Sequence, residues 1–554
     1  MSVQPSPQPK VPDRTVIVAR AAFPKGSLAI RVRDELPGLF ADEDFASAFG
    51  ARGRPGISPG QLALVTVLQF AENLTDRQAA DAVRGRIDWK YCLGMELDDP
   101  GFDFTVLSGF RARLIEHSLE ERVLDILLER LSQSGLLRAG GRQRTDSTHV
   151  LAAVRTLHRI EFVGETVRAT LEALAAAAPD WLATKGMASG EWAKRYGTRV
   201  ESYRLPKDDD ARAELAAAIG RDGFTILEAT VDPGAPLWLR EIPAVEVLRR
   251  VWIQQYQRDQ DKEVRWREGK DLPPGRLRVT SPYDTDARYG MKRGSGWNGY
   301  QAHLTKTCEP DTIHVITHVA TTDATTADQE ITPVVHHGLA ARRLLPDEHD
   351  VDAGYTSAEL VLASHRDHQV ELLGPLKLNP HWQSKDPDAF DLTTFTIDWD
   401  AQQVHCPQGA ISSAWRTTMT SRGTPLVSVD FRKNDCGPCP RRKRCTASPT
   451  GPRKLSFRPR DEHEILERAR VEQDTDAWRR RYAVRAGVEG TIHQAVAVTS
   501  IRRSRYIGTR KTHLANVFAA TALNLIRLDA WRFDARHAPT RTSHLSRLSL
   551  SLVA

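Results

Sequence analysis

Apolar and polar positions repeat with a helical period along the first part of this 554-residue chain. Ser58, followed by a proline, precedes the apolar run 62–70, and this combination is a helix-start signal. Similar starts lie at Thr75 and Ser118. Over residues 40–135 these patterns predict short helices joined by tight turns, as in a helix-turn-helix unit. A plain helical bundle fits the same pattern, so both interpretations stay open.

Beyond residue 140, segments rich in β-branched residues alternate with helical ones. The first, RTDSTHVL at 144–151, is typical of a strand. One long exposed helix is expected from Pro243 to Gly269, with the proline in its first turn. The whole predicts a mixed α/β domain with helices inserted between its strands. The predicted strands are 144–151, 278–280, 301–307, 314–321, 348–352 and 370–374, and the predicted helical segments are 155–275, 328–344 and 461–535.

Composition marks further units. The proline-rich residues 1–35 and the Ser-, Thr- and Arg-rich residues 536–554 are expected to be disordered tails. Loop-rich residues 396–460 hold four of the six cysteines and are expected to form a small Cys-rich insert. The rest of the chain is then divided between two units. These are a helical N-terminal domain at 36–138 and an α/β domain at 139–395 and 461–535.

Overall composition is that of a soluble globular protein, with 40% hydrophobic and 27% charged residues. No run of ~18 apolar residues predicts a transmembrane helix, and the N-terminus lacks the apolar core of a secretion signal. Six cysteines in a chain of this length do not make a disulfide scaffold. We therefore expect a protein that stays in the cytoplasm.

Positive charge gathers in one part of the chain. The formal net charge is +6, but residues 436–511 contain 19 Lys or Arg against 8 Asp or Glu, a local charge of +11. Arginine dominates there, and its planar guanidinium suits bidentate contacts with phosphate. The segment therefore favours a phosphate-binding face, with a solvated basic surface as the alternative.

Asp146 is the first candidate ligand for a metal ion. Mg²⁺ prefers oxygen ligands, and two such ions about 4 Å apart can activate a nucleophile and spread the charge of a phosphodiester during cleavage. Asp146 lies inside a strand-like, mostly uncharged stretch, where a lone carboxylate is unexpected without a partner. A role in a turn or a cap is the alternative.

Asp352 is the second candidate, at the carboxyl end of a short predicted strand, where ligands of α/β folds gather. Gly354 allows a tight turn, and Ser357 or Thr356 is expected to cap the next helix. Asp350 points the same way along the strand and competes for the role, but it lies further from the strand end. A turn-forming aspartate is the alternative.

Glu489 is the third candidate and shares one helical face with Tyr482 and Arg485, because their spacing is i, i+3, i+7. On this interpretation Glu489 faces the metal ions while Arg485 and Tyr482 reach the DNA backbone. The alternative is a surface Arg–Glu pair that contributes roughly a few tenths of a kcal/mol. Spacing does not choose between the two.

Four clustered cysteines suggest a second kind of metal. Only the central pair has tight metal-ligand spacing, as Cys-Gly-Pro-Cys, and a closed set of four thiolates is typical of structural rather than catalytic Zn²⁺. Four reduced thiols in a loop-rich insert are the alternative. The candidate zinc ligands are Cys406, Cys436, Cys439 and Cys445.

Two smaller groups of charged residues have less specific patterns. Lys292, Arg293 and Trp297 combine basic charge with an aromatic ring, which fits either a DNA contact or a solvated loop. Asp328 and Glu330 begin a predicted helix and are expected to cap it.

The order of several short motifs resembles the DDE transposases of bacterial insertion sequences. Residues 52–94 and 102–107 are similar to the N-terminal helical domain of that group, and the resemblance spans roughly residues 40–535. The motifs are Arg144-Thr-Asp-Ser-Thr-His, the segment 281–300 from Ser-Pro-Tyr-Asp to Trp-Asn-Gly-Tyr, Asp352-Ala-Gly-Tyr and Arg485-Ala-Gly-Val-Glu-Gly-Thr-Ile.

The resemblance implies a ribonuclease-H-like catalytic domain with a mixed sheet and helical insertions. It places Asp146 on the first strand, Asp352 after the fourth strand and Glu489 on a later helix. These three residues would bind two Mg²⁺ or Mn²⁺ ions per active site. The all-α domain would precede this catalytic domain and serve DNA binding or dimerisation.

The resemblance also implies DNA contacts from a helix that reads Tyr, two residues, Arg, three residues, Glu, six residues, Lys. Tyr482, Arg485 and Glu489 fit, but the lysine position is Val496. Nearby basic residues are expected to replace that contact. They are Arg502, Arg503, Arg505 and Lys511.

The resemblance implies cleavage of one strand at each transposon end, followed by attack of the 3′-hydroxyl on other phosphodiesters. Expected partners are double-stranded DNA, namely terminal inverted repeats and target DNA, and a second copy of the chain, with no membrane. The expected place is the bacterial cytoplasm, at the nucleoid when acting. The alternatives are an inactive DNA-binding regulator and a metal-dependent nuclease without strand transfer.

Overall fold

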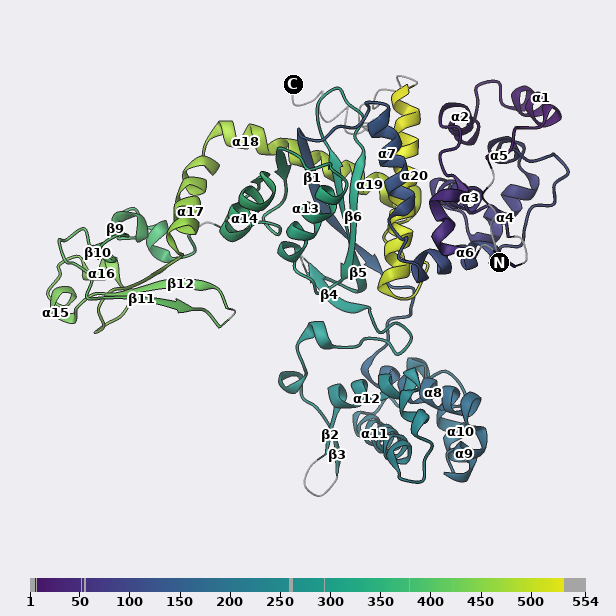
Figure 1. Cartoon of the computed structure of the whole chain (residues 1–554). Helices are drawn as coiled ribbons and strands as arrows, with labels where there is room; N and C mark the ends of the chain where they lie inside the picture. The colour runs from purple at the N-terminus through teal and green to yellow at the C-terminus, as the bar shows by residue number, and fades with distance from the viewer. Residues whose placement is uncertain are drawn as a thin grey trace, which may run out of the picture.

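A mixed β-sheet stands at the centre of the fold in the computed structural model, which describes residues 5, 7–50, 52–53, 56–258, 263–292, 294–377, 379–421 and 423–532 (Figure 1). The sheet order is β4-β5-β1-β7-β8, and β6 also pairs with β5. β5 is antiparallel to β1, whereas β1, β7 and β8 run parallel. The strands are β1 (Arg142–Leu151), β4 (Arg288–Lys292), β5 (Ser295–Thr307), β6 (Ile316–Asp323), β7 (Glu348–Asp350) and β8 (Glu371–Leu373).

Helices cover both faces of this sheet (Figure 1). Successive side chains of β1 point to opposite faces. Thr145 contacts His349, which in turn contacts His336 of α13 (Ile331–Ala341), so this face belongs to α13 and α14 (Ala358–His368). Arg144 and Asp146 point to the other face, which is covered by α19 (Gly487–Thr499) and α20 (Thr509–Arg532).

The N-terminal residues form a helical domain that packs on α20. The predicted Ser58 cap and the Thr75 capping box are confirmed, but Ser118 caps no helix. Phe70 stacks on Phe518 of α20 with ring centroids 5.8 Å apart. The helices are α1 (Asp13–Ala22), α2 (Leu28–Glu35), α3 (Pro59–Ala71), α4 (Asp76–Gly85), α5 (Ile87–Leu93), α6 (Thr105–Glu116) and α7 (Arg122–Gln133).

The prediction of a disordered tail over residues 1–35 is wrong for the part that forms α1 and α2. Ala19 and Ile30 are fully buried, and they pack with Tyr91 of α5. These helices are short and rich in charged residues, so the sequence pattern did not indicate that they form ordered helices. The predicted tail 536–554 lies outside the described residues.

A second helical unit is inserted between β1 and β4 and has its own apolar core. The predicted long helix from Pro243 to Gly269 ends at Gln255, because the chain turns there into the β2–β3 hairpin, and no strand forms at 278–280. The elements are α8 (Arg159–Ala177), α9 (Pro179–Thr184), α10 (Gly190–Tyr196), α11 (Asp209–Val231), α12 (Pro243–Gln255), β2 (Tyr256–Arg258) and β3 (Val264–Trp266).

A small β unit follows β8 and also has its own apolar core. Figure 1 shows it apart from the central sheet, connected by α17 and α18. The sequence predicted loops here, because the strands are short and separated by turns. The elements are β9 (Thr396–Asp398), β10 (Gln403–His405), β11 (Ala414–Met419), β12 (Pro425–Asp430), α15 (Lys433–Cys436), α16 (Arg442–Cys445), β13 (Lys454–Phe457), α17 (Arg460–Gln473) and α18 (Asp476–Ala483).

A close approach between α19 and β1 requires glycine at position 487. A Cβ atom on Gly487 would overlap the guanidinium of Arg144. Arg144 is 5% exposed and its guanidinium donates to the carbonyl of Val484, so it has little freedom to move. Among the described helices, none is long and apolar enough to cross a membrane.

We predict that Gly487→Ala destabilises the protein by about 1–3 kcal/mol, because the added methyl group displaces the Arg144 guanidinium. Gly490→Ala is the matched control three residues further along α19, where an added Cβ meets no atom within 4 Å. It should be neutral or stabilising by roughly 0.5–1 kcal/mol. Denaturant unfolding of both variants measures the difference, and equal stabilities would contradict the close approach.

Candidate active site

Three acidic residues from separate segments converge on one guanidinium. Arg485 Nη2 lies 2.7 Å from Asp146 Oδ2 and 3.8 Å from Asp352 Oδ2. Its Nη1 lies 3.6 Å from Glu489 Oε1. The three predicted acids therefore meet at one place on the α19 face of the sheet. The sequence spacing did not decide whether Glu489 is a site residue or part of a surface ion pair. In the structure it lies near the other acids and is also paired with Arg485.

Local structure fixes the two aspartates more firmly than the glutamate. Asp146 lies in the middle of β1, is 8% exposed, and accepts a hydrogen bond from the Ser147 amide at 2.7 Å. Asp352 follows β7 and accepts from the Gly354 amide at 2.7 Å, so it does form the predicted turn. Glu489 lies in the first turn of α19 with 69% of its side chain exposed. The predicted cap of α14 by Ser357 is confirmed.

Burial raises the pKa of the Asp146 carboxyl, the charge of Arg485 opposes this rise, and the charge of Asp352 adds to it. Two carboxylates held close together in a partly buried place repel each other unless a cation lies between them. Arg485 supplies that cation here. A second cation that lies between them could take over the same electrostatic role.

Asp328 is an acidic neighbour that sequence reasoning placed in a helix cap. Glu330 does close the capping box, by accepting from the Ala327 amide, but Asp328 does not. Asp328 instead lies 3.5 Å from Ser147 Oγ and 3.6 Å from Lys292 Nζ. An acid at a helix start is ambiguous in a sequence, because the cap and the site use the same residue type.

Gly354 leaves the space into which two of these carboxylates point. A Cβ atom there would lie 2.8 Å from an oxygen of Asp328 and 2.8 Å from an oxygen of Asp352. The competing Asp350 is fully buried and pairs with Arg142 at 2.9 Å instead. The structure thus favours Asp352 over Asp350 as the acid beside Asp146.

Two family models match the chain. One, described as "Transposase DDE domain", matches residues 405–529, which include Arg485 and Glu489. The other, described as "Transposase domain (DUF772)", matches residues 10–113, which include α1 to α5. Together the two matches support an insertion-sequence DDE transposase. A search of curated proteins finds no match. The first match excludes Asp146 and Asp352, so their place beside Glu489 comes from the geometry.

The family identification has two general consequences. A transposase is an enzyme that acts on DNA, and a DDE domain implies dependence on a divalent metal ion. Among the described residues, no group of three or more His, Cys, Asp or Glu side chains stands at metal-ligand spacing. In this structure the cation between the carboxylates is the Arg485 guanidinium.

The predicted DNA-binding residues of the transposase fall into two groups. Arg485 pairs with the acids and Tyr482 stacks on Trp478, with ring centroids 4.8 Å apart. Arg505 donates to the Leu74 carbonyl at 2.6 Å and lies over the Phe70 ring. It therefore packs against the N-terminal helices and does not face solvent. The exposed predicted residues are Arg502, Arg503 and Lys511.

The basic patch around Lys292 is only partly available for DNA. Trp297 is 9% exposed, and its indole donates to the Tyr300 carbonyl at 3.0 Å, which marks it as a core residue. Arg293 lies outside the described residues. Lys292 is 45% exposed and lies 3.3 Å from Ser147 Oγ, one residue from Asp146.

The four cysteines gather in the small β unit and line one cavity of about 280 Å³. None forms a disulfide. The amide of Gln408 donates to Cys406 Sγ at 3.2 Å, and the amide of Arg453 donates to Cys436 Sγ at 3.5 Å. Burial raises the pKa of the Cys445 thiol to about 11.

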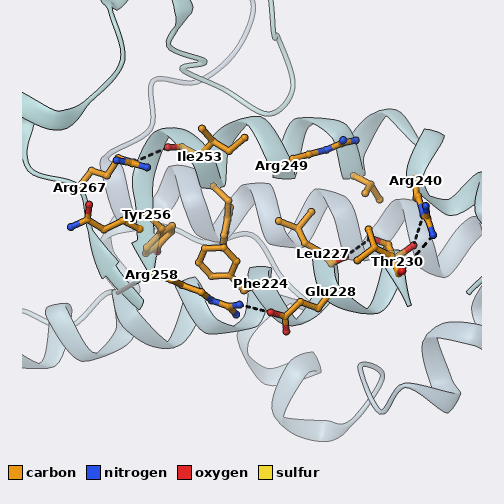
Figure 2. A pocket seen from close by; sticks show the side chains of 14 residues that line it. Phe224, Leu227, Glu228, Thr230, Arg240, Arg249, Ile253, Tyr256, Arg258 and Arg267 are labelled. Carbon is orange, nitrogen blue, oxygen red and sulfur yellow. Dashed lines mark hydrogen bonds and ion pairs between the residues drawn. The ribbon is translucent and has the colours of Figure 1, made fainter. Parts of the chain in front are cut away.

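A groove in the inserted helical unit is larger, at about 520 Å³, but its charged side chains are already paired (Figure 2). Arg258 pairs with Glu228, and Arg267 donates to the Ile253 carbonyl. Arg249 pairs with Glu246 outside the groove. The arginines named here are therefore engaged, and much of the wall is apolar.

We predict that Arg485→Met lowers the free energy of unfolding of the metal-free protein by about 3–5 kcal/mol, because it leaves buried carboxylate charge without a cation. Asp146 is 11% and Arg485 16% exposed at the side chain. Without Arg485 the pKa of Asp146 rises further, so the destabilisation should shrink as the pH falls through that raised pKa. Unfolding curves over a pH series test this, and a pH-independent loss would contradict it.

Proposed function

We propose that this transposase binds the ends of an insertion sequence and catalyses metal-dependent DNA strand cleavage and strand transfer with Asp146, Asp352 and Glu489. The observation that carries the proposal is the convergence of these three acids on Arg485, at 2.7, 3.8 and 3.6 Å. Residues so far apart in the chain meet only because the fold brings β1, the end of β7 and α19 together. A surface ion pair would not require that.

The sheet order supports a ribonuclease-H-like catalytic domain. β5 pairs antiparallel with both β1 and β6. β7 and β8 come later in the chain and lie parallel to β1 on its other side. The first acid lies on β1, the second follows β7, and the third lies on a later helix. On this proposal residues 139–395 and 461–535 form the catalytic domain, and residues 396–460 are an insert.

The donor set fits Mg²⁺ or Mn²⁺ in kind, because all three acids offer only oxygen. Asp146 and Asp352 already share one cation, and the absence of a side chain at Gly354 leaves room for the Asp352 carboxylate. These two aspartates, with Glu489, would hold two ions. When bound, the ions supply charge that activates the nucleophile and stabilises the leaving oxygen.

The residues around the acids would position DNA. Arg502 Nε donates to Thr148 Oγ1 at 2.8 Å, so this exposed guanidinium lies two residues along β1 from Asp146. Lys292 lies 3.6 Å from Asp328. We propose that these two residues, with the exposed Arg503 and Lys511, would hold the backbones of the terminal repeats and of target DNA. We further propose that a homodimer acts at the bacterial nucleoid, one subunit at each end.

We predict that Asp146→Asn, Asp352→Asn and Glu489→Gln each abolish cleavage of transposon-end DNA in Mg²⁺, because each removes an oxygen charge that an ion requires. Binding to the same DNA should persist. Asp474→Asn is the matched control, since its side chain is 92% exposed on the turn before α18. Gel assays of binding, nicking and joined products measure all three steps.

The same assay separates the alternatives. A regulator would bind DNA and never cleave it, whereas a nuclease would cleave without joined products. Chelation of Mg²⁺ should stop cleavage by the unaltered chain and leave DNA binding in place. Full cleavage by any of the three variants would remove that residue from the proposed site.

We also propose that Cys406, Cys436, Cys439 and Cys445 hold a structural Zn²⁺ in the small β unit. The four thiols surround one cavity, and backbone amides already donate to two of their sulfurs. Such amide–sulfur hydrogen bonds favour thiolate, the form that binds zinc. Bringing the thiols to ligand distance requires the loops of α15 and α16 to close on the ion.

We predict one zinc per chain in the purified protein and its loss in Cys439→Ser, because a set of three thiolates binds more weakly than four. Cys92→Ser is the control, since Cys92 is a buried cysteine of the N-terminal helices. Elemental analysis by mass spectrometry measures the content. A chain that purifies without zinc from zinc-supplemented cells would show that the cysteines are simple reduced thiols.

A further inference from the structure

Three cations lie buried together on the sheet face that also carries Asp146. Arg144 on β1, Lys306 on β5 and Arg527 on α20 are 5%, 4% and 9% exposed. Long cationic side chains are rarely buried to this degree unless an anion accompanies them. No carboxylate forms an ion pair with any of the three among the described residues.

The sheet register places two of these cations directly opposite each other. Arg144 pairs with Lys306 across the β1–β5 ladder, so both side chains point to the same face. Like charges in this position destabilise a sheet. Lys306 therefore either repels Arg144 or gives up its proton, and a bound anion would remove that cost.

Of the three cations, Lys306 differs from the two arginines in its hydrogen bonding. Arg527 donates to Gln494, Thr491 and the His314 carbonyl, all at 2.9 Å, and Arg144 donates to the Val484 carbonyl. Lys306 has no hydrogen-bond or ion-pair partner among the described residues. Arg144 also keeps one buried nitrogen, Nε, without a partner.

These cations line a cavity of about 900 Å³ between β5, α19 and α20. Lys306 and Arg144 lie at its buried side, while Thr312 and the 44% exposed Trp531 form part of its exposed side. The acidic residue of the lining, Asp311, is exposed and forms no ion pair within the described chain. The cavity is thus open to a ligand and cationic where it is deepest.

We infer that this cavity binds a phosphate group of the DNA strand that the neighbouring carboxylates process, with Lys306 as its principal contact. The inference rests on the proposed function. Arg144 and Asp146 are two residues apart on one face of β1, which is about 7 Å. That distance corresponds to about two base-pair steps along the duplex axis, at about 3.4 Å each. The cavity is therefore within reach of the same strand.

Protonation links phosphate binding to pH. Burial, together with the charges of Arg144 and Arg527, lowers the pKa of Lys306 to about 6. Lys306 is then largely neutral at neutral pH without a ligand, and a bound phosphodiester anion raises its pKa and draws in a proton. Binding should weaken as the pH rises. The other titratable or charged groups facing Lys306 are Arg144, Cys308, Asp311, His314 and Arg527, and burial lowers the pKa of His314 to about 4.

The test uses the full-length protein with Lys306→Met, which keeps length and removes charge. We expect the salt dependence of binding to a transposon-end duplex to lose about one phosphate contact, a change of about 0.9 in the slope of log K against log[salt]. Lys270→Met is the control, because Lys270 is 76% exposed in the inserted helical unit, and should leave the slope unchanged. Without DNA, Lys306→Met should raise the melting temperature.

A second arm separates DNA from free phosphate. Inorganic phosphate and a 5′-phosphorylated oligonucleotide are titrated by calorimetry in two buffers of different ionisation enthalpy, which reports proton uptake. An unaltered salt-dependence slope in Lys306→Met overturns the inference. Proton uptake on binding of inorganic phosphate but not of the oligonucleotide also overturns it. If Lys306→Met does not fold, Lys306→Arg should retain the slope and Lys306→Gln should lose it. Because binding is read without cleavage, failure here is distinct from failure of the proposed active site.

Discussion

The guanidinium of Arg485 makes the contacts on which the arrangement of the proposed catalytic face depends. Asp146 is set by the register of β1, and Asp352 is set by the end of β7, so the sheet alone brings two carboxylates together. Their repulsion in a partly buried place has to be balanced. Arg485 provides the balance from another part of the chain, and in doing so it holds the start of α19, and with it Glu489, against the sheet.

The same helix makes a second and opposite kind of contact two residues earlier on β1. There the sheet presents a cation, Arg144, which lies against Gly487 and is directly opposite Lys306. On the face that α19 covers, β1 therefore carries the anion Asp146, which needs a cation, and the cation Arg144, which with Lys306 of β5 lacks an anion. A metal ion and a DNA phosphate together would satisfy both. The proposed metal site and the proposed phosphate cavity would therefore each neutralise the charge that the other leaves on this face of the sheet.

Sequence reasoning succeeded where one residue type has one local meaning. A serine directly before an apolar helical repeat is a cap at Ser58 and Ser357, although not at Ser118, and the aspartate before a glycine turn lies at a strand end at Asp352. It failed where the meaning is set by distant partners. Asp328 looks like a cap and Lys306 looks like one position in an alternating strand, and only the packing of other elements gives them their neighbours.

The two inserted units explain why the acids are so widely spaced in the sequence. The helical unit leaves the sheet after β1, and the small β unit leaves it after β8, and each has a core of its own. Neither core has to be completed by the sheet, so the insertions lengthen the chain without altering the ladder that aligns β1, β5 and β7. Linear spacing between acids is therefore free to vary in such a fold. The strand register and the α19 contact are the quantities that must stay fixed, because a shift of one residue in β1 would turn Asp146 to the opposite face.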